Sequence, residues 1–108
     1  MVRTSNARVV LVTCGSLAEA RKIAKAVVGQ SLAACVNVIS VPVESMYRWE
    51  KKVERAREFL MIIKTTKRRL TQLELEITRL HSYEVPEFLV IEVAGGSKKY
   101  LKWLIDSA

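Results

Sequence analysis

The alternation of apolar and polar positions predicts a strand and then a helix in the first third of the chain. Residues 8–14 form a short β-branched apolar run that ends at a glycine, which is typical of a buried strand. Ser16 and Glu19 have the spacing of a capping box, in which each side chain satisfies a free backbone N–H at a helix start. Apolar residues then recur at helical spacing over 17–28, and Gly29 suits the end of the helix.

The middle of the chain has the pattern of a long β-hairpin. Residues 33–49 have an extended pattern whose apolar parity changes near 40–42, which predicts a bulge or a break. The Lys51–Lys52 pair stands at the expected tip, and residues 53–64 form the return strand. Such strands exceed the usual length of about five or six residues. Their far ends should therefore project beyond a small domain and need a neighbour to pair with.

The last third predicts a helix, a connector, a strand and a short final helix. Thr65 or Thr66 can cap a helix whose apolar residues recur at helical spacing. Residues 81–87 are expected to be a connector, because they contain a proline that disfavours helical backbone in the residue before it. Residues 88–93 form the fourth strand, and Ser97 starts the last amphipathic helix.

The order of these elements, βαββαβ with a C-terminal helix, predicts an α+β protein with a ferredoxin-like sandwich. Residues 1–7 are expected to be a loose N-terminal segment, and residues 8–108 a single domain. In this fold both main helices cover one face of an antiparallel sheet, and the other face usually alternates out to water. The runs 9–12, 59–63 and 88–91 are apolar at both parities, so a bare monomer would expose a large apolar face. We therefore expect another copy of the chain to cover it.

Composition places the chain among ordinary single-domain proteins. It has 108 residues, 50% of them hydrophobic, and its apolar runs are too short to span a bilayer. The N-terminal residues have no signal-like pattern, so we expect a cytoplasmic protein with two free thiols and no membrane partner. The net charge of +7 raises the question of a polyanion partner. Because the basic residues are scattered along the chain, as on a solvated surface, nucleic acid is not the expected partner.

Five short motifs resemble those of a known family in their order and spacing. They are Ala34-Cys35-Val36-Asn37, Tyr47-x-Trp49, Glu58-x-Leu60 leading to Ile63-Lys64-Thr65, His81-x-Tyr83-Glu84-Val85-Pro86-Glu87, and Tyr100-Leu101-x-Trp103-Leu104. Together they are similar to the CutA-type family of divalent-cation (copper) tolerance proteins. The resemblance implies a tight homotrimer without enzymatic activity, which binds or signals divalent metals, copper especially, in the cytosol. The residues expected at the trimer interface are Tyr47, Trp49, Phe59, Tyr83 and Trp103.

The chain departs from the family pattern at three places. Lys51 stands where a glycine is common, so the tip of the hairpin is expected to differ. The segment 41–43 lacks the glycine of a Pro-Gly turn and has one extra residue, which fits the change of parity. Ser82 replaces the proline that usually follows the motif histidine, which loosens this connector. None of these changes removes an obvious ligand.

Candidate metal ligands follow from residue chemistry. His81, Cys14 and Cys35 are the only imidazole and thiols, and soft or borderline metals favour such ligands. Their spacing matches no closed zinc motif, so a site for weakly bound Cu(II) or another divalent cation would be assembled in space, with Glu84 or Glu87. The alternatives are buried apolar cysteines, a histidine that interacts with a helix dipole, and glutamates that bond across a subunit interface. Folding is not expected to need the metal.

Basic residues near the start of the second helix are a candidate anion site. Lys64, Lys67 and Arg68 oppose the helix dipole, so a bound small anion or the nearby acids Glu54 and Glu58 should offset them. A small-anion or RNA-binding module is therefore the alternative to a metal-linked module.

Other functions of this fold lack their site features in the sequence. The RNA recognition motif displays exposed aromatics on its central strands, whereas residues 59–63 are mainly aliphatic. An acylphosphatase-type hydrolase needs an arginine-bearing phosphate loop after the first strand, and residues 14–17 contain no arginine. The aromatic residues at 47, 49, 100 and 103 suit a core or an interface better than a base-stacking platform.

Overall fold

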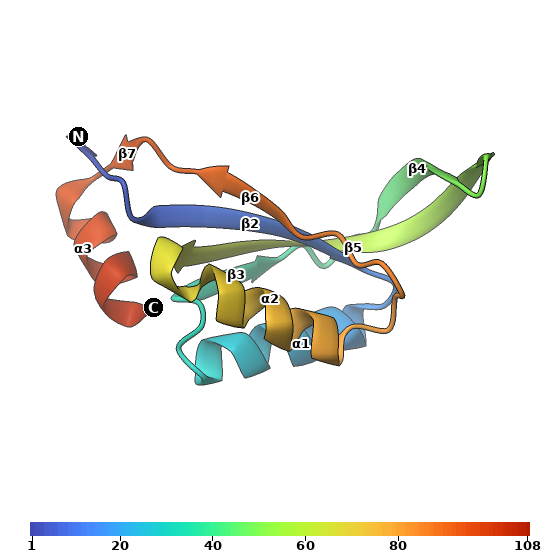
Figure 1. The fold of residues 1–108 in the computed structure, drawn as a ribbon, viewed down its shortest axis with the longest axis horizontal. Coiled ribbons are helices and arrows are strands. Elements are labelled where there is room, and N and C mark those ends of the chain that lie inside the picture. The colour runs from blue at the N-terminus through green and yellow to red at the C-terminus, as the bar shows by residue number, and fades with distance from the viewer.

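The computed structural model describes all 108 residues and shows three α-helices with antiparallel sheets. The elements are β1 (Val2–Arg3), β2 (Ala7–Cys14), α1 (Leu17–Gly29), β3 (Cys35–Val38), β4 (Val43–Trp49), β5 (Lys52–Thr66), η1 (Lys67–Arg69), α2 (Leu70–Leu80), β6 (Leu89–Glu92), β7 (Gly95–Gly96) and α3 (Lys98–Ser107). The main sheet has the strand order β3-β5-β2-β6, which is the order of a ferredoxin-like sandwich. The helices α1 and α2 lie along one face of the sheet, and α3 lies with both termini at one end of the molecule (Figure 1). None of the helices combines the length and the apolar character that a membrane span requires.

The first helix follows the predicted pattern closely. Ser16 is its N-cap, and its hydroxyl accepts a hydrogen bond from the Glu19 N–H at 3.1 Å. Its residues Ala20, Ile23 and Val27 are buried at i, i+3 and i+7 against the sheet. The reciprocal half of the expected capping box is absent, because the Glu19 carboxylate instead accepts hydrogen bonds from the backbone and hydroxyl of Ser82. This side chain therefore links the start of α1 to the connector after α2.

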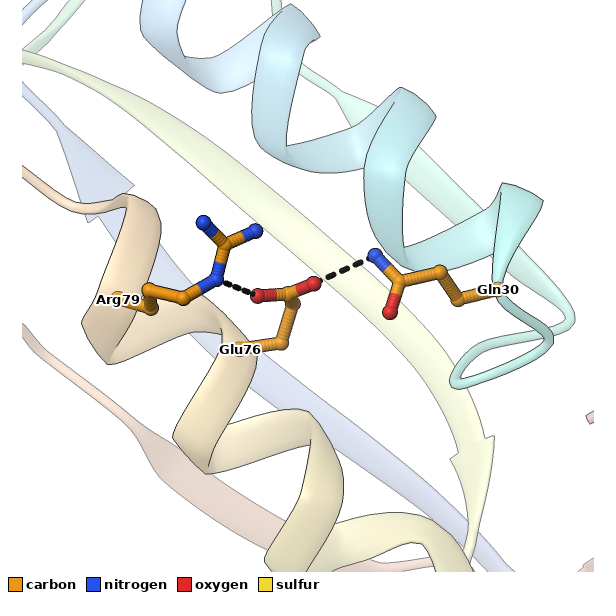
Figure 2. Close-up of polar contacts among 3 residues, drawn as sticks. All are labelled: Gln30, Glu76 and Arg79. Atoms are coloured by element: carbon orange, nitrogen blue, oxygen red, sulfur yellow. Dashed lines mark hydrogen bonds and ion pairs between the residues drawn. The ribbon is translucent and has the colours of Figure 1, made fainter.

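The second helix begins differently from the prediction. Neither Thr65 nor Thr66 caps it through a side chain, because the Thr65 hydroxyl donates to the Leu32 carbonyl at 2.7 Å and the Thr66 hydroxyl is buried without a partner. The chain passes through the short 3₁₀ turn η1 before α2 starts. Glu76 then joins the two helices, since its carboxylate accepts hydrogen bonds from Gln30 at the end of α1 and from Arg79 of α2 (Figure 2).

One hydrophobic core fills the space between the helices and the sheet. It contains Val10 and Val12 from β2, Met61 and Ile63 from β5, and residues of both helices. In antiparallel strands, directly paired residues share a face, and Val10 pairs with Ile63 while Val12 pairs with Met61. The structure therefore selects one of the two apolar parities of these strands for the core.

The opposite face of the sheet, called the open face below, is apolar and has no helix along most of its length. Its paired residues are Val9, Leu11, Leu60, Ile62, Leu89 and Ile91. Leu89 and Ile91 on the edge strand β6 are 57% and 46% exposed. Soluble proteins rarely expose such a contiguous apolar surface. The expectation of an uncovered apolar face in the single chain is thus confirmed.

The hairpin projects from the sheet as an arm, which is β4 together with residues 52–58 of β5 (Figure 1). It accounts for much of the 44 Å length of the molecule, whose other dimensions are 25 Å. The tip is one residue earlier than predicted, because Trp49 pairs with Lys52 and the turn residues are Glu50 and Lys51. Both turn residues have positive φ, 48° and 68°, which is the geometry of a type I′ turn. The chain supplies neither glycine nor asparagine for this turn.

The prediction of a loose N-terminal segment over residues 1–7 is wrong in two places. Val2–Arg3 pairs with Gly95–Gly96 as a small antiparallel sheet, and Ala7 is fully buried at the start of β2. The pairing depends on glycine, since a Cβ on Gly95 would lie only 2.3 Å from the Val2 carbonyl oxygen. The sequence pattern missed this pairing because two-residue strands have no periodicity to detect.

Candidate functional site

An acidic groove of about 650 Å³ lies along the arm and beside the connector of residues 81–87. Four carboxylates line it, from Glu44 on β4, Glu58 on β5, and Glu84 and Glu87 on the connector before β6. Its apolar and aromatic lining residues are Met46, Tyr47, Trp49, Tyr83 and Val85. In a chain with a net charge of +7, this concentration of acids is local and opposite in sign to the whole.

A hydrogen bond between Tyr83 and Glu58 holds one wall of the groove. The Tyr83 hydroxyl donates to the Glu58 carboxylate at 2.8 Å, and Glu58 is only 8% exposed. Burial, followed by this hydrogen bond and the charge of Glu58, raises the pKa of the Tyr83 hydroxyl well above its ordinary value. Gly15 permits the approach, because a Cβ at that position would lie 3.2 Å from the Tyr83 hydroxyl oxygen. The tyrosine therefore donates a hydrogen bond to Glu58 and keeps its proton.

The acids of the groove have few positive partners within the chain. The structure has three ion pairs, and only one, between the exposed Glu44 and Arg55 at 3.5 Å, involves a groove residue. Burial, and then the charge of Glu58, raises the pKa of the Glu87 carboxyl. Two carboxylates, Glu58 and Glu87, thus repel each other in a partly buried place without a cation from this chain. A bound cation would relieve this repulsion.

A second group of candidate ligands lies beneath the connector, and we call Cys14, Glu19 and His81 the Cys14 cluster. Their possible ligand atoms all lie within 4.8 Å of one another. The Cys14 Sγ lies 3.7 Å from the His81 Nε2 and 3.6 Å from the Met61 Sδ. Burial, followed by the charges of Glu19 and Glu58, raises the pKa of the Cys14 thiol to about 12. The thiol therefore keeps its proton at neutral pH.

Hydrogen bonds already occupy the imidazole and the carboxylate of the Cys14 cluster. The Tyr83 N–H donates to His81 Nδ1 at 3.1 Å, so Nδ1 carries the lone pair and Nε2 carries the proton. That Nε2–H group points at the Thr13 carbonyl oxygen, 2.8 Å away. The Glu19 carboxylate is occupied by Ser82, and a metal would need the deprotonated thiolate of Cys14. Metal binding would have to replace these hydrogen bonds, and the cluster instead fastens the connector to β2 and α1.

The other predicted site residues lie apart from both groups. Cys35 is a free, half-buried cysteine on β3 that pairs with Lys64 of β5, far along the strand from the groove residue Glu58. In the candidate anion site, the Arg68 guanidinium donates to the Ala108 carbonyl at 2.8 Å and the Lys67 N–H donates to the Asn6 carbonyl. The Arg68 side chain and the Lys67 backbone N–H are therefore already partnered within the chain.

The five residues expected at a trimer interface have different surroundings. Tyr47 and Trp49 are 45% and 43% exposed on the arm, and Trp103 is 46% exposed on α3 beside Tyr100. Phe59 is half-buried and packs against the main core, so its ring is largely used within the chain. The fifth residue, Tyr83, donates its hydroxyl hydrogen bond to Glu58 in the groove.

Sequence reasoning missed the groove as a unit. It singled out Glu84 and Glu87 as possible ligands, but it assigned Glu58 only to offsetting the helix dipole and did not consider Glu44. One signal was available. Glu58 directly precedes the apolar run 59–63, and on β5 it shares the parity of Leu60 and Ile62 on the open face. An acid at that parity on a strand predicts a polar end to an otherwise apolar face.

Comparison with known proteins agrees with the fold and the motifs. Residues 8–107 match the model of the family described as CutA1 divalent ion tolerance protein. A "divalent-cation tolerance protein CutA" from Thermus thermophilus is 43% identical over 99 residues, which cover 92% of this chain and 95% of that protein. A Thermus thermophilus structure superposes with a TM-score of 0.91 at 40% identity, over 94% of this chain and 97% of the other.

Two further relatives differ in the location that their names give. "Protein CutA, chloroplastic" from Arabidopsis thaliana is 42% identical over 92% of this chain, and the chain spans 54% of its length. The structure of a "periplasmic divalent cation tolerance protein CutA" from Archaeoglobus fulgidus has a TM-score of 0.89 at 37% identity, over 94% of this chain and 97% of that one. The agreement in sequence, length of match and fold leaves one conclusion. This chain belongs to the CutA1 divalent ion tolerance protein family.

Proposed function

We propose that this chain is a non-enzymatic, homotrimeric module of divalent-cation tolerance whose cation site is the acidic groove. The observation that carries the proposal is a buried carboxylate without a positive partner. Glu58 is nine-tenths buried, Glu87 is close enough to be affected by its charge, and no lysine or arginine of the chain pairs with either. A divalent cation bound between them would compensate two negative charges at once.

The choice of metal follows from the donor atoms. The groove offers carboxylate oxygens and no thiol or imidazole, and such donors suit Mg²⁺, Ca²⁺ and Mn²⁺ better than soft ions. Copper(II) also accepts oxygen ligands, and we include it in the test because of the family resemblance. Within the predicted ligand set, Glu84 and Glu87 remain proposed ligands, and Glu58 and Glu44 join them. Cys14 and His81 are proposed to hold the connector in place.

The proposed trimer is supported by the open face. Its six apolar residues have no cover within the chain, and covering them by other copies would remove apolar area from water. The arm carries two exposed aromatic residues, of the type that is enriched in interfaces. The cytoplasm is our proposed location, and the two unpaired cysteines are compatible with its reducing conditions.

Two measurements test this function. The first is the solution mass by light scattering after size exclusion, with chelator, with Mn²⁺ and with copper(II), and we expect a mass near three chains in each. The second is calorimetric titration of Mn²⁺ and Cu²⁺ into the protein and into the Glu87→Gln variant, with Glu74→Gln as a charge-matched control on the exposed side of α2. We expect Glu87→Gln to weaken binding about tenfold and Glu74→Gln to leave it unchanged. Equal affinity in all three proteins would show that the groove is not the cation site.

A further inference from the structure

The net charge of the chain is gathered at one end of the folded molecule. Three segments, residues 1–8, 64–69 and 92–108, lie at the end away from the arm, together with both termini (Figure 1). They contain nine of the eighteen lysines and arginines but only two of the eleven acids, so their charge is +7. The remaining residues have nine basic and nine acidic side chains and are neutral as a group. The fold thus concentrates charges that are scattered along the sequence.

Two contacts between distant segments bring these charges together. Val2–Arg3 pairs with Gly95–Gly96, directly before the two lysines at the start of α3. The Arg68 guanidinium donates to the Ala108 carbonyl at 2.8 Å, which joins η1 to the other end of α3. Because a helix rises by about 1.5 Å per residue, the charges extend over roughly the 15 Å length of α3. We call the five exposed cations of this surface the basic end: Arg3, Lys67, Arg68, Lys98 and Lys99.

Acids within the chain do not neutralise the basic end. The two acids of the same segments face other cations, since Asp106 pairs with Lys102 at 2.7 Å and Glu92 stands opposite Arg8 in the sheet. None of the three ion pairs of the chain includes a residue of the basic end. Neither η1 nor α3 has an acid in its first turn, whereas α1 has Glu19, so the helix dipoles add to the positive potential. The surface therefore attracts negative charge.

The basic end shares no residue with the surfaces that we assign to the trimer. Those surfaces are the open face, the aromatic residues of the arm, and Trp103. Packing two basic ends against each other would bring like charges together, so copies of the chain are not expected to cover one another there. The acidic side of a neighbouring arm is the one part of the chain with the charge to do so, and the solution mass of a variant tests this.

The arrangement of the charges favours a chain of phosphates as the partner. Cations spread along a whole helix cannot converge on one small anion, whereas a nucleic-acid strand carries a phosphate at every nucleotide and follows a basic surface. An anionic membrane is less suitable, because surface helices insert an apolar face, and Leu101 and Leu104 of α3 are buried within the chain. We propose that the basic end binds single-stranded RNA through its phosphate backbone, without sequence specificity. This binding is separate from the cation site in the groove.

The test is fluorescence anisotropy of a labelled short oligouridylate with the assembled protein at several salt concentrations. Five phosphate contacts give log K a slope of about −3.5 against log salt, so each doubling of the salt concentration should weaken binding about tenfold. The variant Lys67→Gln/Lys98→Gln/Lys99→Gln removes three contacts, so the slope should become shallower by about 2 and the affinity at low salt should fall about tenfold. The matched control replaces three exposed cations of α1 instead: Arg21→Gln, Lys22→Gln and Lys25→Gln. This control should retain the slope and affinity of the wild type.

The outcomes distinguish the basic end from net charge, from a membrane surface and from a subunit interface. Equal losses in the two triple variants would overturn the proposal, because net charge would then control binding. Absence of RNA binding would also overturn it, and co-sedimentation with phosphatidylserine vesicles in that case would identify a membrane surface instead. A lower solution mass of the basic-end variant would show that these residues pair with a neighbouring copy, against the proposal. Titration with Mn²⁺ should give the same result in both variants, so the groove is tested independently.

Discussion

The state of the Cys14 thiol gives a prediction that separates a structural cluster from a metal-binding one. Cys14 is fully buried, and its pKa is raised to about 12 from the ordinary value of 9.0, mainly by burial. A pKa that is higher in the folded than in the unfolded protein means that the folded state keeps its proton while the unfolded state loses it. The resulting stability is fully present below pH 9, and it is lost progressively as the pH rises toward 12.

The size of this stability loss depends on how far the pH of the measurement lies above the pKa of the unfolded Cys14 thiol. At pH 10 the unfolded thiol is one pH unit above its pKa of 9.0, while the folded thiol is still protonated. Deprotonation then favours the unfolded state by about 1.4 kcal/mol, and almost none of this effect is present at pH 8. Other groups also titrate in this range, so the quantity to measure is a difference between variants.

The assay is urea unfolding at pH 8 and pH 10, at one protein concentration, for the wild type, Cys14→Ala and Cys35→Ala. Between the two pH values the wild type should lose about 1.4 kcal/mol more free energy of unfolding than Cys14→Ala. Cys35→Ala removes the other thiol, which is half-buried on β3, and serves as the matched control. If the wild type and Cys14→Ala lose the same amount, the folded thiol ionises as readily as the unfolded one. In that case the Cys14 cluster would offer a thiolate, and our structural interpretation of it would be refuted.

Three further predictions concern the tip, the groove and the open face. Lys51→Gly should raise the free energy of unfolding by about 1 kcal/mol in urea titrations, because glycine adopts the φ of 68° without steric cost, and a decrease would contradict the turn geometry. Tyr83→Phe should lower it by about 1–2 kcal/mol, because buried Glu58 loses its hydrogen-bond donor, and an unchanged urea midpoint would argue against this bond. Leu11→Glu should reduce the solution mass from that of the proposed trimer to that of one chain, whereas Leu75→Glu on an exposed part of α2 should not, and an unchanged mass in both would place the interface elsewhere.

The parts of the fold that the sequence predicted correctly depend on interactions between near neighbours. The helix α1 is an example, since its N-cap Ser16 and its buried residues at i, i+3 and i+7 are specified within about a dozen residues. The parity change near residues 40–42 likewise marks the real gap between β3 and β4. The parts that were missed depend on distant partners. The pairing of Val2–Arg3 with Gly95–Gly96 and the Glu19–Ser82 hydrogen bonds join segments that no local pattern relates.

The candidate site was predictable only as a set of separate residues. The connector motif brought Glu84 and Glu87 forward, because their family resemblance is carried by a continuous run. Glu58 belongs to the same groove through a hairpin that returns to the connector, which is a fact of tertiary structure. The chemical preference for thiol and imidazole ligands pointed at Cys14 and His81. It could not anticipate that His81 is already hydrogen-bonded at both ring nitrogens.

The connector relates the two groups of candidate ligands. Its first residues, His81 and Ser82, are tied to β2 and α1 by the hydrogen bonds of the Cys14 cluster, and its later residues Tyr83, Glu84 and Glu87 line the groove. Tyr83 joins the two groups, because its backbone N–H donates to His81 and its hydroxyl donates to Glu58. The hydrogen bonds of the Cys14 cluster therefore position one wall of the groove. An altered metal response in a His81 variant is therefore explained by a displaced groove wall as well as by a lost metal ligand. Variants of the groove carboxylates distinguish these two explanations.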